Sequence, residues 1–260
     1  NGEILALDYD QIDDVGAYLR APEPASLYRM HGNLSGAYLV KNISCRNRVV
    51  LTNKTPTGLN RGFGGPQHYY ALERLVHQIA VKLKLDRLAV IELNLVKDKD
   101  FPYQSASGAL LDSGQYKKLM DKVVNSNEFS DIKLQQKKAL EKGNLYGIGY
   151  TAIVEPSVSN MGYITTAVPF EEREKAGHKG GAIASATVSI GPTGGIYVTC
   201  DSVPQGQGHK TVLAQVVADV FGISFGNISV NGELDTEKDA WSIAAGNYSS
   251  RFAGAVAGTT

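Results

Sequence analysis

The loop from Thr57 to Gln67 has the residue types of a ligand-binding turn. It contains four glycines, an arginine and a phenylalanine, and a helical pattern follows directly. Glycine adopts backbone angles that other residues avoid, and it lets a ligand approach the main chain closely. The N-terminus of a following helix presents N–H groups and a partial positive charge to an anion. The pattern indicates a site where the backbone binds a ligand and Arg61 and Phe63 project toward it; a tight turn without a ligand is the alternative.

Two further loops of small residues also precede helical patterns. Gly206–His209 reads Gly-Gln-Gly-His, follows a predicted strand that ends at Asp201, and leads into a helix through Val212–Phe221. The third loop, Ala244–Ser250, leads into a helix of small residues over 252–258. Three converging sets of backbone donors suit a large, polar cofactor that carries phosphate.

Familiar nucleotide-binding and catalytic motifs are missing from the sequence. No Gly-Lys-Ser/Thr follows any of the loops, and Gly206-Gln207-Gly208 lacks the third glycine of the dinucleotide fingerprint. No set of His, Cys, Asp and Glu has metal-ligand spacing, so no metal ligand is assigned, and no nucleophile elbow occurs. Two side chains keep two interpretations each. His209 is either a ligand contact or a structural residue, and Phe63 either faces a flat ligand or fills the core.

Composition restricts the class of protein. The chain has 260 residues, with 26 basic and 26 acidic side chains and no formal net charge. Such balance argues against a nucleic-acid-binding surface. The two cysteines, Cys45 and Cys200, form no disulfide framework and favour a reducing, cytoplasmic compartment. No apolar run is long enough to predict a membrane span, and no signal peptide opens the sequence.

Apolar periodicity and turn residues predict an α/β (α+β) fold. Strands are expected over 3–10, 36–40, 45–52, 147–155, 182–190, 195–200 and 228–231, and helices over 66–83, 85–95, 115–124, 133–143, 212–221 and 252–258. A charged helix end and a change of character at Gly147 indicate a boundary between residues 1–145 and 146–260. We therefore expect two lobes, each a mixed sheet with helices packed on it. Both chain ends read as interrupted elements, which predicts a fragment or a split subunit.

The ordered set of motifs resembles a known family. Thr52-Asn53-Lys54 and Arg61–Gln67 (Arg-Gly-Phe-Gly-Gly-Pro-Gln) are similar to the most recognisable block of the molybdopterin-binding large subunit of molybdenum hydroxylases. This family contains xanthine dehydrogenase, aldehyde oxidase and aerobic carbon monoxide dehydrogenase. The motifs that follow at familiar intervals are Leu72–Leu75, Asn94-Leu95, Phe101–Tyr103, Asp112–Tyr116, Gly206–His209 and Ala244–Gly246. The resemblance covers nearly the whole chain.

The resemblance implies roles for particular residues. Arg61 and Gly62 would lie against the molybdenum centre, and Phe63 would present its ring to a flat substrate. Gln207, between Gly206 and Gly208, would hydrogen-bond the cofactor. The pterin and its phosphate would be held by a loop that contains Ala244, Ala245, Gly246 and Ser249. Arg29 falls where some purine-oxidising members keep a substrate-orienting arginine, although its flanking residues differ.

The same resemblance implies partners and an activity. Residues 1–145 would complete the first molybdopterin-binding domain and residues 146–260 would begin the second. The family's upstream glycine-rich loop and downstream glutamate general base have no counterpart here, so the chain is expected to be inactive alone. Its partners would be the remaining parts of the large subunit, iron–sulfur and flavin (FAD) subunits, and a small-molecule substrate. The cofactor would be molybdenum–molybdopterin, with the cytosine dinucleotide form as one version.

Two alternatives to a hydroxylase of aldehydes or N-heterocycles stay open. One is a large-chain fragment of an aerobic carbon monoxide dehydrogenase, whose centre holds copper beside molybdenum. Copper(I) selects thiolate ligands, and the loop Thr57–Gln67 contains no cysteine. The other alternative is a structural or assembly module that keeps the fold without the cofactor.

Overall fold

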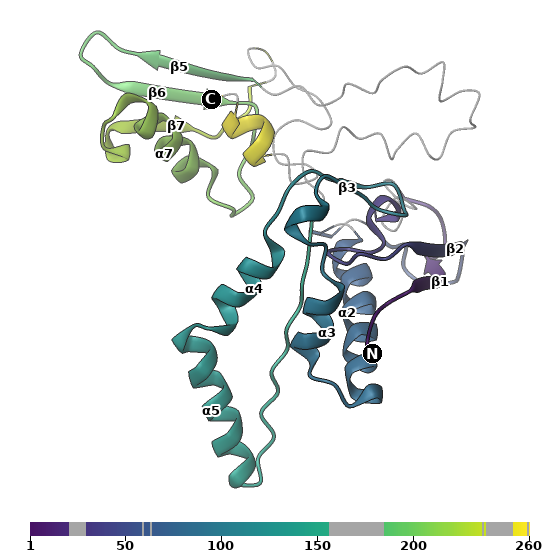
Figure 1. Ribbon diagram of the computed structural model, residues 1–260. Helices are drawn as coiled ribbons and strands as arrows, with labels where there is room; N and C mark the ends of the chain where they lie inside the picture. The colour runs from purple at the N-terminus through teal and green to yellow at the C-terminus, as the bar shows by residue number, and fades with distance from the viewer. Residues whose placement is uncertain are drawn as a thin grey trace. The chain divides into compact units, whose positions relative to one another are not determined.

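The computed structural model describes residues 1–20, 30–58, 60–62, 64–155, 185–235, 237, 252–258 and 260 (Figure 1). The chain divides into two compact units, Asn1–Glu155 and Pro156–Thr260. Each unit is described by itself.

The described residues of the first unit combine a parallel strand pair with four helices. Strands β1 (Ala6–Asp14) and β2 (Asn42–Val50) pair in parallel along their whole length, from Ala6 opposite Asn42 to Asp14 opposite Val50. Its other elements are the 3-10 turns η1 (His31–Asn33) and η2 (Asp98–Asp100), the hairpin β3 (Tyr103–Gln104) with β4 (Leu110–Leu111), and the helices α2 (Gly65–Leu83), α3 (Arg87–Asn94), α4 (Tyr116–Val124) and α5 (Asn127–Glu141).

Helix α2 begins directly after the first glycine loop. Its N-cap residue, Gly64, has φ 81°, a left-handed conformation that glycine adopts without a steric penalty. Pro66 follows in the first turn, where its missing N–H removes no helical hydrogen bond. The predicted apolar stripe is buried at Tyr69, Leu72, Val76 and Ala80. The sequence therefore predicted both the start and the buried face of this helix.

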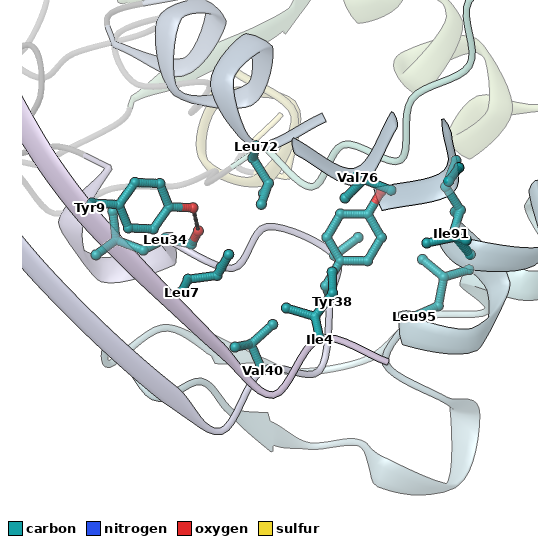
Figure 2. Close-up of a cluster of buried hydrophobic side chains, with 13 residues drawn as sticks. Ile4, Leu7, Tyr9, Leu34, Tyr38, Val40, Leu72, Val76, Ile91 and Leu95 are labelled. Atoms are coloured by element: carbon teal, nitrogen blue, oxygen red, sulfur yellow. Dashed lines mark hydrogen bonds between the residues drawn. The ribbon is translucent and has the colours of Figure 1, made fainter. Parts of the chain in front are cut away.

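The core of the first unit lies between α2, α3 and one face of β1 (Figure 2). Alternate residues of β1, Leu7 and Tyr9, point into it, as expected for a strand with one covered face. The other large contributors are Ile4, Leu34, Tyr38, Val40, Leu72, Val76, Ile91 and Leu95. This core fixes the ends of β1 and β2 and the start of α2 relative to one another.

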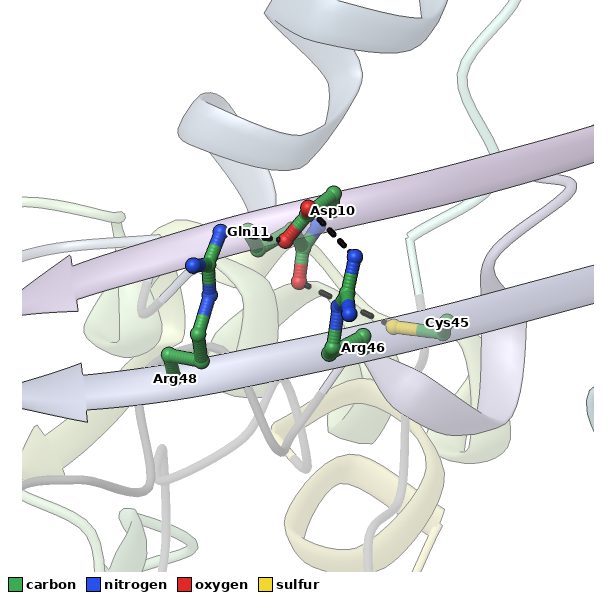
Figure 3. A network of polar contacts seen from close by, with 5 residues as sticks. All are labelled: Asp10, Gln11, Cys45, Arg46 and Arg48. Carbon is green, nitrogen blue, oxygen red and sulfur yellow. Dashed lines mark hydrogen bonds and ion pairs between the residues drawn. The ribbon is translucent and has the colours of Figure 1, made fainter.

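The opposite face of the strand pair is polar. Asp10 on β1 accepts hydrogen bonds from Arg46 and Arg48 on β2, at 2.8 Å and 2.7 Å (Figure 3). On the other face of the pair, which also carries Tyr9, the thiol of Cys45 lies 3.9 Å from Oε1 of Gln11. The side chains of Asp10, Arg46 and Arg48 are solvent-exposed, so their ion pairs contribute little to stability.

The second unit contains a mixed three-stranded sheet. Strands β5 (Ala186–Ile190) and β6 (Ile196–Cys200) form the predicted hairpin, and β7 (Ile228–Asn231) pairs in parallel with β6. Helix α7 (His209–Phe221) connects β6 to η4 (Phe225–Asn227) and β7, and it ends at Gly222 in a left-handed C-cap, as predicted. The element η6 (Phe252–Ala257) is a short π-helix.

Two predicted strands are wrong. Residues 36–40 form turns with a single bridge from Tyr38 to Leu95, because Gly36 has a left-handed φ of 57° that interrupts an extended chain. Residues 147–155 belong to no strand in the described part of the chain. This segment instead packs on the first unit, whose boundary lies after Glu155.

The described helices give no candidate for a membrane span, since none combines sufficient length with sufficient apolar character.

Candidate functional site

The first glycine loop lies beside the carboxyl ends of the parallel strands β1 and β2. The backbone of Val15 and Gly16, just after β1, forms hydrogen bonds with the end of β2 and the chain that follows it. Val15 N–H donates to Val50 O at 3.1 Å, and Thr52 N–H donates to Gly16 O at 2.9 Å. Thr57 N–H then donates to Val15 O at 3.0 Å. The entry to the loop is therefore fixed by main-chain hydrogen bonds at the end of the strand pair.

Asp14 and Gly16 make this close approach possible. The carboxylate of Asp14 accepts hydrogen bonds from Thr52 Oγ1 at 2.7 Å and Gly16 N–H at 3.1 Å, and it pairs with Lys54 Nζ at 3.0 Å. The hydrogen bond from Thr52 and the charge of Lys54 hold the pKa of Asp14 below its usual value. A Cβ on Gly16 would lie 2.6 Å from the backbone of Thr55 and Pro56, so only glycine fits.

The loop itself uses glycine at two consecutive turns. Gly62 has φ 97°, and a Cβ there would lie 2.7 Å from the ring of Pro66. Gly65 N–H donates to Gly62 O at 3.0 Å and closes the turn into α2. Arg61 and Gly62 are both exposed, and no described side chain caps helix α2. The loop therefore presents its main chain and an arginine on the surface of this unit.

Two aromatic residues in the first turns of α2 connect the helix that follows the loop to the rest of the unit. His68 is buried, with Nε2 3.1 Å from Leu34 O, and its ring lies against Tyr9. Tyr69 donates its hydroxyl to Val154 O, which also accepts from Asn33 Nδ2 at 3.1 Å. These contacts connect the start of α2 to η1 and to the segment 147–155.

An open groove of about 670 Å³ runs from the glycine loop along α2. Its walls are α2 and the extended segment 148–155 of the same unit. The lining includes two tyrosines, a histidine and two arginines, and it consists of Gly62, Pro66, Tyr69, Tyr70, Glu73, Arg74, His77, Arg87, Ile148, Thr151, Ile153 and Glu155. Rings and cations beside a glycine loop can hold a flat, polar molecule.

A buried carboxylate lies at the wall of this groove. Glu73 accepts a hydrogen bond from the Tyr38 hydroxyl at 2.6 Å, and Arg87 Nη2 lies 3.8 Å from its other oxygen. Burial raises the pKa of Glu73, against the weaker opposing effects of Tyr38, the Ala152 N–H and Arg87. Arg87 also lies over the Tyr150 ring. Glu73 thus connects α2 to three other parts of the unit.

The second glycine loop joins the carboxyl end of β6 to the N-terminus of α7. Anions bind at this place in α/β units. Gly206 and Gly208 have φ of 90° and 82°, and a Cβ built on either meets no atom of the described residues within 4 Å. Gly208 is the N-cap of α7, and no side chain among the described residues caps the helix. Open space beside uncapped N–H groups fits a large anionic ligand.

Gln207 closes this loop on itself. Its Oε1 accepts the N–H of Gln205, so the carboxamide oxygen already has a partner in the chain. Its Nε2 group makes no hydrogen bond within the described residues. Gln207 can therefore offer N–H donors to a ligand without opening the loop.

The base of the second loop is a buried Ser–His pair. Ser202 Oγ lies 3.0 Å from Nδ1 of His209, and both side chains are 1% exposed. Burial lowers the pKa of His209 and favours the neutral ring. Its Nε2 is buried and has no hydrogen-bond partner among the residues that the structure describes. The His209 ring stacks on Phe252, with ring centroids 3.6 Å apart.

Comparison with known proteins identifies the family of this chain. Two models of the molybdopterin cofactor-binding domain match it, one over residues 1–95 and the other over residues 122–260. The chain belongs to the molybdopterin-binding family of the molybdenum hydroxylase large subunits.

Individual members of this molybdopterin-binding family are similar along nearly the whole chain. The nicotine 6-hydroxylase large subunit of Paenarthrobacter nicotinovorans is 30% identical over 97% of the chain, and the carbon monoxide dehydrogenase large chain of Hydrogenophaga pseudoflava is 29% identical over 96%. The structure of reconstituted CO dehydrogenase from Oligotropha carboxidovorans matches 99% of the chain with a TM-score of 0.74 at 25% identity, and the match covers 32% of that chain. The molybdopterin-binding chain spans 30% of the length of either curated relative.

The structure describes five of the predicted site residues of this molybdopterin-binding chain. Arg61 and Gly62 lie together in the first unit, and Gly206, Gln207 and Gly208 lie together in the second. The other predicted site residues lie outside the described residues: Arg29, Phe63, Ala244, Ala245, Gly246 and Ser249. Among the residues that are described, no group of three His, Cys, Asp or Glu could hold a metal ion.

Sequence reasoning missed several residues that shape the two loops of the molybdopterin-binding chain. Gly16 and Asp14 hold the first loop, Glu73 lines the groove, and Ser202 orients His209. A signal existed for Gly16, because glycine directly after a strand often marks a close backbone approach. Ser202 and Glu73 carried no local signal, since their partners are identified only by the folded chain.

Proposed function

We propose that the chain forms part of the molybdenum-cofactor-binding catalytic subunit of an oxidoreductase that hydroxylates aldehydes or N-heterocycles. The observation that carries the proposal is the second glycine loop. Within the described part of the chain, Gly206 and Gly208 leave open space beside the uncapped start of α7, at the carboxyl end of β6. A phosphate-bearing cofactor fits that combination of space and N–H donors.

The residues present fit a molybdopterin group. The N–H groups at the start of α7 and the Nε2 group of Gln207 would bind its polar and phosphate atoms, with Ala244, Ala245, Gly246 and Ser249 as further contacts. Arg61 and the main chain of Gly62 would lie near the metal end. Phe63 would orient the substrate, with Arg29 as a second substrate contact. Residues 1–145 and 146–260 would then belong to the first and second molybdopterin-binding domains.

When bound, the molybdenum cofactor supplies the redox centre that oxidises the substrate and passes electrons onward. The contribution of this chain is to bind and orient. Uncapped N–H groups at the start of α7 favour an anion, and the hydrogen bonds of Asp14 and Thr57 keep the first loop at the strand ends. We propose that iron–sulfur and FAD partners take the electrons, and that the 260 residues alone are inactive because the implied glutamate base is not among them. A cytoplasmic location belongs to the same proposal.

The alternative within the family is carbon monoxide oxidation, because a similar protein is named a carbon monoxide dehydrogenase large chain. Copper(I) selects thiolate ligands. Cys45 lies exposed on β2, and the buried Cys200 directs its thiol toward Ser202 O at 3.6 Å. Neither cysteine belongs to a glycine loop, which favours the hydroxylase over the copper enzyme.

The test uses the complete native complex that contains this chain. Molybdenum, pterin, copper and released cytosine nucleotide are measured, and carbon monoxide, a small aldehyde and an N-heterocycle are assayed with an artificial electron acceptor. We expect molybdenum and pterin near one per chain, with turnover of the aldehyde or the heterocycle. A complex without molybdenum and pterin would indicate a structural or assembly module. Carbon monoxide oxidation with stoichiometric copper would support the alternative enzyme.

A further inference from the structure

The first residues of α7 and η6 contact each other through their rings. His209 begins α7, Phe252 begins η6, and their ring planes lie 4° from parallel with centroids 3.6 Å apart. Phe252 packs at the same time on the buried cluster of Cys200, Leu213 and Val256. The stack therefore fixes the start of one helix against the start of the other.

A second contact sets the orientation of the His209 ring. Ser202 follows β6 by two residues, and its hydroxyl lies 3.0 Å from Nδ1 of His209. Ser202 and His209 directly flank the loop Val203–Gly208 in sequence. Their hydrogen bond therefore closes the base of the loop that carries Gln207.

The ring of His209 is almost completely closed to solvent. It is 1% exposed, and its Nε2 has no hydrogen-bond partner within the described residues. An unsatisfied buried polar atom is unfavourable, and an apolar ring at this position would avoid it. A role beyond filling space accounts for a histidine that joins Ser202 on one side and Phe252 on the other.

The position of Phe252 in the sequence indicates what that role is. It comes shortly after Ala244–Ser249, the segment that the family resemblance assigns to the pterin and its phosphate. His209 comes directly after Gly206–Gly208, the other loop assigned to the cofactor. The stacked pair thus joins the chain that leaves one assigned segment to the chain that leaves the other.

We propose that His209 and Phe252 are a positioning pair, whose ring stack holds the Gly206–Gly208 loop in a fixed place relative to the start of η6. The inference rests on the proposed function. The two residues act through the loops, and the retention of a bound cofactor depends on the stack.

Four variants separate the parts of this contact. His209→Asn keeps a polar group near Ser202 and removes the ring, and Phe252→Leu removes the flat partner. Phe252→Tyr keeps the stack and serves as the conservative rescue. Val198→Ala is the matched control, because Val198 is fully buried in β6 but belongs to a different core cluster.

The measurements are the half-time of molybdenum and pterin loss from the complete complex and its thermal midpoint. An aromatic pair of ordinary strength corresponds to a roughly threefold to tenfold change in an equilibrium or rate. We expect His209→Asn and Phe252→Leu to shorten the half-time by about that factor, and Phe252→Tyr to restore it. Val198→Ala should lower the thermal midpoint and leave the half-time unchanged.

Two results would contradict the proposed positioning role of His209 and Phe252. One is an unchanged half-time in both His209→Asn and Phe252→Leu. The other is equally fast loss from Val198→Ala at a matched thermal midpoint, which would make the stack an ordinary core contact. A wild-type complex without molybdenum and pterin is a different result, because it refutes the proposed function itself.

Discussion

The hydroxyl of Tyr38 donates a 2.6 Å hydrogen bond to Oε1 of Glu73, and both side chains are almost completely buried. The two residues are 35 positions apart, one in the turns after η1 and the other on α2. Arg87 on α3 approaches the second carboxylate oxygen at 3.8 Å. A single carboxylate therefore holds three segments beside the groove that begins at the glycine loop.

Removing either partner should destabilise the first unit. Tyr38→Phe leaves a buried carboxylate oxygen without its donor, and we expect a loss of about 1–3 kcal/mol in unfolding free energy. Glu73→Ala leaves Arg87 without its buried partner, and we expect about 3–5 kcal/mol. Denaturant unfolding measures both. Tyr70→Phe, at an exposed tyrosine of the same helix, is the control and should stay within about 0.5 kcal/mol.

The stability contribution of Glu73 should depend on pH in a defined direction. Burial raises its pKa above the ordinary 4.5, so the folded state holds this proton more tightly than the unfolded state. Stability from this group is complete below pH 4.5 and is lost as the pH rises through the folded-state value. Glu73→Gln removes the titration. Unfolding measured from pH 4 to 7 should show wild type losing stability relative to this variant; parallel curves would contradict the assignment.

A methyl group on Gly16 should displace the first loop. Gly16 has φ 85°, and the added Cβ would lie 2.6 Å from the backbone of Thr55 and Pro56. Gly108→Ala is a matched control, because Gly108 has φ 105° with no atom within 4 Å of the added Cβ. Both variants carry left-handed strain of about 1–2 kcal/mol. We expect Gly16→Ala to lose clearly more unfolding free energy; equal losses would mean that the close approach has no effect.

The sequence predicted those parts of the fold that depend on local chemistry. The glycine loops, the start of α2 and the C-cap at Gly222 all follow from backbone preferences of single residues. The resemblance to the family was confirmed by the domain models that match residues 1–95 and 122–260. The residue roles at the two loops stay predictions.

Features that depend on distant partners were not predictable in this way. Residues 147–155 alternate like a strand, but the carbonyl of Val154 accepts from Tyr69 and Asn33 side chains instead of joining a ladder in the described chain. Glu73 looks like a solvated charge on α2 because its partner Tyr38 is remote in sequence. Only the folded arrangement reveals that Glu73 and the segment 148–155 line the same groove.

The exposed cysteine should be a slow nucleophile at neutral pH. Partial burial, with a smaller effect of Asp8, raises the pKa of Cys45 above its usual value of 9.0. Since the thiolate is the reactive form, alkylation of Cys45 should be slow at pH 7 and should accelerate up to and beyond pH 9. Buried Cys200 should react only after unfolding, and Cys45→Ser identifies the labelled site. A rate that is independent of pH between 7 and 9 would be incompatible with the raised pKa.

The two groups of the Gln207 carboxamide should have separable effects on the cofactor. Oε1 accepts the Gln205 N–H and closes the loop, while Nε2 makes no hydrogen bond within the described residues. Gln207→Glu keeps an acceptor for Gln205 and removes the donor, whereas Gln207→Ala removes both. If Nε2 binds the cofactor, each variant loses a hydrogen bond of about 0.5–1.5 kcal/mol and leaves an unpaired group on the ligand. We expect both variants to reduce molybdenum and pterin per complex, with Gln207→Glu retaining the thermal midpoint better than Gln207→Ala. If Gln207→Glu kept its full cofactor content while Gln207→Ala lost cofactor, Nε2 would not bind the cofactor, and the role of Gln207 would be to close the loop.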